Sequence, residues 1–210
     1  RELIMAVSKV DAANQIENTL PIAQGGTGVT TGTLVLLSTA TADDDASIAF
    51  DNTIFTDTYL TYLVIGQDIV GATDNQALGV QLSTDNGSSY TTSGYALVAE
   101  GYRSDDTNGT AGFRGGAAHS RMWLTGTRHN HGNATNEKVN FFAYYYGLRN
   151  AASHKYCGFT TSFTADNGAL SSNIGTTGTT NITAKVNNIR FINSSGNITS
   201  GKFSIYGVLL

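Results

Sequence analysis

Residues 20–32 read Leu-Pro-Ile-Ala-Gln-Gly-Gly-Thr-Gly-Val-Thr-Thr-Gly and divide the chain into two parts of different character. The stretch holds the only proline of the 210 residues and four glycines in eight positions. Proline removes a backbone donor and glycine weakens regular structure, so neither a helix nor a central strand is expected to run through it. The sequence therefore predicts a hinge, with hinge residues Pro21, Gly25, Gly26 and Gly28.

The segment before the hinge is short and poor in apolar residues. Leu3, Val7 and Val10 have the spacing of one coiled-coil heptad, but the next positions of the pattern are polar. An isolated helix of this length is marginal in water. We expect residues 1–32 to form a short stalk with its Gly-rich hinge, helical or extended, that becomes ordered by association.

After the hinge, the sequence is typical of short β-strands separated by polar turns. Leu78, Val80 and Leu82 alternate strictly with other residues, and the turn signal Asn86-Gly87 follows. About nine or ten such runs recur, joined by Gly, Asn, Thr and Ser, without a convincing helix. The sequence predicts an all-β head over residues 33–210, an antiparallel β-sandwich of jelly-roll type.

Two pairs of neighbouring runs are expected to form hairpins. Residues 33–38 and 46–50 flank an acidic turn, and residues 188–193 and 202–207 flank the turn Ser-Ser-Gly-Asn. In the second pair, apolar side chains alternate along both runs, which predicts that they point inward together. The acidic turn lacks the spacing and closing Glu of an EF-hand, so we expect it to be solvated.

The composition limits the possible functions. Charged residues make up 13% of the chain and the formal net charge is −4. A general nucleic-acid binder needs a basic surface, so we expect no nucleic-acid partner. The single cysteine, Cys157, cannot form an intrachain disulfide, which is compatible with folding in a reducing cytoplasm.

Catalytic motifs are absent from the sequence. It contains no Gly-x-Ser-x-Gly, no His-Glu-x-x-His and no phosphate-binding loop. His154 lies three residues before Cys157, which in a strand places the two side chains on opposite faces. Glu100 is the one glutamate in a predicted strand, so a pair of facing carboxylates is not expected. The sequence favours a protein that is not an enzyme and has no cofactor.

A His-x-His step occurs at His129 and His131. In extended chain both imidazoles would lie on one face, and a three-fold axis would bring six together. The neighbouring Arg128 opposes metal binding, and the surrounding sequence is loop-like. We expect a surface loop without metal.

Aromatic residues fall on polar faces of the predicted strands. Trp123 lies opposite Met122, on the same side as Arg121, while Tyr144 and Tyr146 lie opposite buried positions. Aromatic rings stack on sugars, and guanidinium and amide groups bind their hydroxyls or acids. Packing against neighbouring protomers explains such rings equally well. The candidate receptor-binding residues are Arg121, Trp123, Arg128, His129, His131, Tyr144, Tyr146 and Tyr156.

Two stretches resemble tailed-bacteriophage tail fibres. The motif Pro-Ile-Ala-x-Gly-Gly-Thr-Gly at residues 21–28 is similar to the segment that joins shaft to head. The ending at residues 189–207 looks like the C-terminus of small β-sandwich head domains of such fibres.

The resemblance implies a receptor-binding fibre tip in the virion, made in the host cytoplasm. Its expected partners are two further copies of itself, in a homotrimer, other virion tail proteins, and a host-surface glycan or lipopolysaccharide. The alternatives are a structural virion protein, such as a capsid-decorating fibre or fibre joint, and a secreted carbohydrate-binding module.

Overall fold

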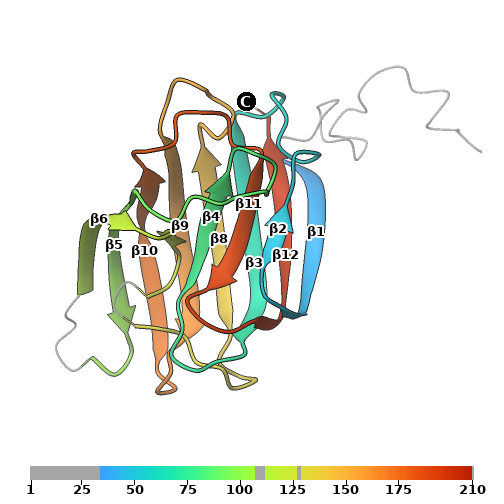
Figure 1. Cartoon of the computed structure of the whole chain (residues 1–210). Helices are drawn as coiled ribbons and strands as arrows, with labels where there is room; N and C mark the ends of the chain where they lie inside the picture. The colour runs from blue at the N-terminus through green and yellow to red at the C-terminus, as the bar shows by residue number, and fades with distance from the viewer. Residues whose placement is uncertain (1–33, 107–111, 127–128, 210) are drawn as a thin grey trace, which may run out of the picture. The chain divides into compact units, whose positions relative to one another are not determined.

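The computed structural model describes residues 34–106, 112–126 and 129–209, with the backbone alone at 112–114 (Figure 1). The predicted stalk at 1–32, and with it Pro21, Gly25, Gly26 and Gly28, lies outside the described residues. Within the described ranges, no helix is long and apolar enough to cross a membrane.

The described residues form twelve strands. They are β1 (Leu34–Asp45), β2 (Ile48–Phe50), β3 (Thr61–Gly71), β4 (Leu78–Ser83), β5 (Tyr95–Arg103), β6 (Gly112–His119), β7 (Met122–Trp123), β8 (Val139–Tyr146), β9 (Lys155–Thr164), β10 (Leu170–Thr179), β11 (Asn188–Asn193) and β12 (Ile198–Val208).

The strands form two sheets that pack face to face, as Figure 1 shows with β4, β11 and β2 in front of the larger sheet. The larger sheet has eight strands in the order β1-β12-β3-β8-β9-β10-β5-β6, and the smaller has four in the order β2-β11-β4-β7. All neighbours pair antiparallel. The predicted antiparallel β-sandwich is confirmed, and its strand order is compatible with a jelly roll.

Alternation along the strands decides which side chains enter the core. In β8, Val139, Phe141, Ala143 and Tyr145 are buried, whereas the residues between them face outward. Side chains alternate because successive Cβ atoms of a strand point to opposite faces of the sheet. The small sheet covers one face of the large sheet, so the outward residues of β8 lie on the face that it leaves uncovered.

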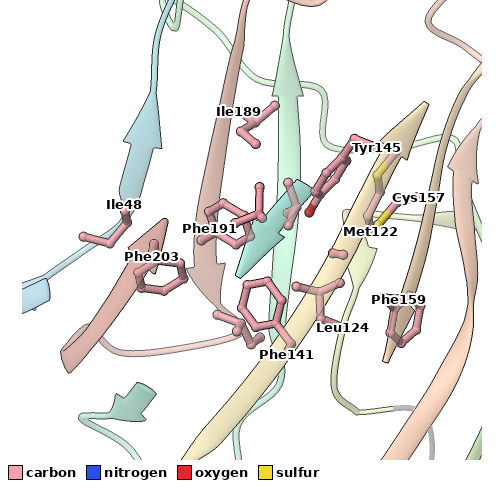
Figure 2. Close-up of a cluster of buried hydrophobic side chains, with 14 of the residues drawn as sticks. Ile48, Met122, Leu124, Phe141, Tyr145, Cys157, Phe159, Ile189, Phe191 and Phe203 are labelled. Carbon is pink, nitrogen blue, oxygen red and sulfur yellow. The ribbon is translucent and has the colours of Figure 1, made fainter. Parts of the chain in front are cut away.

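A cluster of phenylalanines joins the two sheets (Figure 2). Phe191 of the small sheet contacts Phe203 and Phe141 of the large sheet, with ring centroids 5.0 and 5.7 Å apart. It also meets Phe50 of its own sheet edge-on at 6.3 Å. Such ring contacts are favourable beyond the apolar area that they bury. Phe191 is thus the centre of the contact between the sheets.

Both expected hairpins are wrong. The runs at 33–38 and 46–50 belong to β1 and β2, which pair with β12 and β11 in different sheets. The strands β11 and β12 also belong to different sheets, so their apolar side chains point inward from opposite sides of the core. The connector at 194–197 can span about 13 Å, more than the ~10 Å between packed sheets. A short polar turn therefore marks a strand end without determining its partner.

Replacing Phe191 tests the inter-sheet cluster. Phe191→Ala should lower the free energy of unfolding by about 3–5 kcal/mol, because it leaves a cavity between the sheets. Leu60→Ala, at a 68% exposed position outside the strands, should change it by less than about 0.5 kcal/mol. Urea unfolding followed by circular dichroism measures both. Similar losses in the two variants would show that Phe191 does not hold the sheets together.

Candidate functional site

The tyrosines that the sequence placed on a polar face lie on the outer face of the eight-stranded sheet. Tyr144 and Tyr146 stack in β8, with ring centroids 6.4 Å apart and planes 16° from parallel. Tyr156 of β9 is the cross-strand partner of Tyr146. Both Tyr146 and Tyr156 are almost half exposed, at 44% and 47%. The structure therefore brings these three residues together.

Most of the exposed apolar surface lies on this same face. Among the described residues, nine of the ten large apolar side chains that are exposed point outward from the eight-stranded sheet, as the strand register shows. We call this surface the tyrosine face. Its nine exposed members are Leu34, Leu36, Val98, Tyr102, Phe142, Tyr146, Tyr156, Leu170 and Ile174.

Trp123 and Arg121 lie on the opposite side of the sandwich, on the outer face of the small sheet. Trp123 pairs with Gly79 of β4, and the adjacent pair Met122 and Val80 points into the core. The guanidinium of Arg121 lies 4.8 Å from the centre of the Trp123 ring. Glycine at position 79 leaves room for this, since a Cβ there would stand 2.6 Å from Arg121 Cδ. The predicted receptor-binding residues thus divide between two faces.

A second arginine and aromatic pair lies on the outer face of the small sheet. Arg190 of β11 places its guanidinium 4.0 Å from the centre of the Tyr90 ring. Its Nε and Nη2 both donate to Oε1 of Gln81, at 3.0 and 2.7 Å. Sequence reasoning missed Arg190 and Tyr90. The available signal was that Arg190 lies between the inward residues Ile189 and Phe191, so its side chain must point outward.

The two arginines form a positively charged surface in an acidic chain. Within the described residues, neither takes part in an ion pair with a carboxylate. Burial, and next the positive charge of Arg190, lower the pKa of Arg121. Asp85, near Tyr90, is held by Ser83 and Ser89 rather than by an arginine. We call the surface of Arg121, Trp123, Gln81, Arg190 and Tyr90 the arginine surface.

Unpaired donors mark one corner of the arginine surface. The Arg121 Nη1 atom donates to the carbonyl oxygen of Asn193 at 2.6 Å. Arg121 Nε and Trp123 Nε1 are buried and have no hydrogen-bond partner among the described residues. Buried donors without partners are uncommon in folded proteins and cost free energy. This corner of the surface therefore lacks an acceptor.

The two histidines do not converge. Arg103 donates from Nη1 to Nδ1 of half-buried His129, at 3.2 Å. His131 is fully buried and forms hydrogen bonds with Gly132 O and Asn193 Oδ1, at 3.0 and 3.2 Å. No group of three or more His, Cys, Asp or Glu side chains suited to a metal occurs in the described part of the chain. The predicted site residue Arg128 lies outside the described residues.

Cys157 is buried inside the sandwich, next to the Tyr145 hydroxyl (Figure 2). Burial raises the pKa of the Cys157 thiol to about 12, and the smaller effect of the nearby Tyr145 hydroxyl acts in the opposite direction. His154 is exposed. The thiol is therefore protonated at neutral pH and separated from the imidazole that a Cys-His pair would need.

Searches with this chain found no matching family model and no matching curated protein. The two outer faces of the sandwich differ in their chemistry. One is broad and apolar, and the other carries two arginines stacked on aromatic rings.

His131 should make the fold sensitive to mild acid. Burial lowers the pKa of His131 below its ordinary value of 6.5, so the unfolded chain takes up its proton more readily than the folded chain. The stability due to this group is complete above about pH 6.5 and is lost as the pH falls below it. Urea unfolding at about pH 7.5 and about pH 5.5, where carboxylates stay ionised, measures the loss.

The matched variant is His131→Gln. It should be less stable at both pH values, but its stability should change less between them. The other three histidines, His119, His129 and His154, are the same in both proteins. An identical pH dependence of wild type and variant would contradict the assignment to His131.

Cys157 should react with a thiol reagent only when the chain unfolds. With a pKa of about 12 the thiolate fraction at pH 8 is on the order of one in ten thousand, and the sulfur is inaccessible. Labelling with Ellman's reagent should therefore be slow in buffer and complete in urea. Rapid labelling of the folded chain would show a reactive cysteine.

Proposed function

We propose that this chain is the head of a bacteriophage tail fibre, which binds a glycan on the host surface without catalysing a reaction. It acts as a homotrimer attached to other tail proteins of the virion. The sequence resemblances to fibre hinge and fibre head support this proposal, and the antiparallel sandwich is the fold that they imply. The receptor is an acidic surface polysaccharide or lipopolysaccharide.

The arginine surface carries the glycan-binding part of the proposal. Two guanidinium groups that lack carboxylate partners in the described chain attract an anion, because they otherwise repel each other. Guanidinium groups bind carboxylates and phosphates through two parallel hydrogen bonds. Acidic sugars and lipopolysaccharide cores carry these groups.

The same surface is organised before a ligand arrives. The buried side chain of Gln81 accepts two hydrogen bonds from Arg190 at Oε1. Its Nε2 donates to the carbonyl oxygen of Ser120, at 3.0 Å. The guanidinium carbons of Arg121 and Arg190 lie over the rings of Trp123 and Tyr90, at 4.8 and 4.0 Å from the ring centres. A side chain fixed in this way loses less entropy on binding.

A structural virion protein is the second candidate. The tyrosine face favours it, because a broad exposed apolar surface is typical of contact with other proteins. A fibre joint or capsid-decorating fibre would use that face and would need no arginine surface. Glycan binding by the arginine surface separates the two candidates.

The double variant Arg121→Lys, Arg190→Lys tests glycan binding. Lysine keeps the charge but loses the planar fork and its stacking, so binding should weaken about tenfold, or ~1.4 kcal/mol. Calorimetry or surface plasmon resonance with purified bacterial capsular polysaccharides and lipopolysaccharides measures it, with neutral dextran for comparison.

The control is the same substitution at Arg149, whose guanidinium already has a carboxylate partner in Asp57 at 2.9 Å. Arg149→Lys should leave binding unchanged. If wild type binds none of the acidic polysaccharides, or if both variants bind as wild type does, the arginine surface is not a glycan site.

A further inference from the structure

The tyrosine face is large enough for a stable interface. The sheet has eight strands about 4.8 Å apart, each roughly eight residues long with a rise of about 3.3 Å per residue. These dimensions give the face an area on the order of 900 Å². A standard protein interface buries about 800 Å² on each partner. Exposed apolar patches above a few hundred Å² on a single chain mark sites of interaction. This face therefore has the area that a stable association needs.

The chemistry of the face suits protein better than sugar. Val98, Leu170 and Ile174 are its most exposed members, at 73%, 68% and 55%, and aliphatic side chains provide no flat ring for a pyranose. Aromatic enrichment and few charges are typical of the core of protein interfaces. Covering these side chains with another apolar surface removes the most apolar area from water, which lowers the free energy most.

The face carries few charges, which allows two copies of an acidic chain to meet there. Glu100 lies among the apolar residues and accepts a hydrogen bond from the Tyr102 hydroxyl at 2.7 Å. Lys202 and the ion pair of Lys138 with Asp68 lie toward one end of the strands. The formal charge of −4 on each chain therefore produces little repulsion at the centre of this face.

The tyrosine face carries both raised aromatic rings and hollows. Phe142 and the stacked pair of Tyr144 and Tyr146 form a ridge along β8. Hollows of about 560 and about 190 Å³ lie on either side of Val98 of β5, lined in part by residues 174–180. Further hollows of about 320 and about 600 Å³ lie beside Phe142 and beside Leu170, so hollows occur on both the β8 and the β5 parts of the face.

We propose that copies of this chain associate through the tyrosine face, with the aromatic ridge of one copy packed against the hollows beside Val98 of the next. The inference extends the homotrimer of the proposed function by naming the surface that the copies share. The proposed function supplies only the number of copies, three, on which this inference rests. The inference does not depend on glycan binding.

Light scattering after size exclusion of the full chain tests it. Wild type should be an oligomer at micromolar concentration. Val98→Lys, Ile174→Lys places two unpaired charges in the proposed interface and should raise the dissociation constant at least ~100-fold, so that monomers elute. Leu60→Lys, at the one large exposed apolar position away from the face among the described residues, should leave the oligomer intact.

Hydroxyl-radical labelling of wild type provides a second test that needs no variant. Tyr102, Tyr146 and Tyr156 should become protected as concentration rises through assembly, whereas Tyr90 and Trp123 on the opposite face should not. A monomeric wild type, or a double variant that still assembles, would overturn the proposal. The proposal would also be overturned if the tyrosine face became protected only when polysaccharide or lipid vesicles were added.

The outcomes separate assembly from glycan binding. The monomeric double variant retains Arg121 and Arg190, so its binding per chain to the polysaccharide that wild type recognises should be unchanged. If wild type assembles but does not bind the polysaccharides, the proposed function is contradicted. If wild type binds the polysaccharide but is a monomer, the proposal that copies associate through the tyrosine face is contradicted.

Discussion

The contact of Phe191 with Phe141 and Phe203 joins a four-stranded sheet to an eight-stranded one, and the rest of the structure depends on it. A sheet is stable in water only when its apolar face is covered. The small sheet covers the inner face of the large sheet, and strands such as β1 and β6 extend the large sheet at its two edges. The opposite face of the large sheet has no cover within the described chain, although it carries nine exposed large apolar side chains.

This asymmetry assigns different chemistry to the two outer faces. On the small sheet, Arg121 and Arg190 lie on aromatic rings and lack carboxylate partners within the described residues, which suits an acidic ligand. On the large sheet, the exposed side chains suit another protein surface. The proposed fibre head would use both properties, since weak glycan sites become effective when several copies are held together. The two faces point away from each other, so association through one leaves the other open.

Alternation along single strands predicted the side-chain directions well, because the period of two depends only on the local backbone. Tyr146 and Tyr156 are outside, Phe191 and Ile205 are inside, and Cys157 is buried. Strand pairing could not be predicted, since a turn such as residues 194–197 serves a hairpin and a sheet crossing equally well. The sequence therefore could not show that Trp123 and Tyr146 lie on opposite faces. The burial of His131 was also hidden, because it depends on contacts with Gln76 and Ala165, distant in sequence.

A structure of the assembled 210-residue chain, by cryo-electron microscopy or crystallography, tests whether the two faces have separate roles. We expect Val98, Ile174 and Tyr146 to contact another copy, while Trp123 and Arg190 make no contact with other copies. An assembly in which Trp123 and Arg190 are buried between copies, with the tyrosine face exposed, would contradict it.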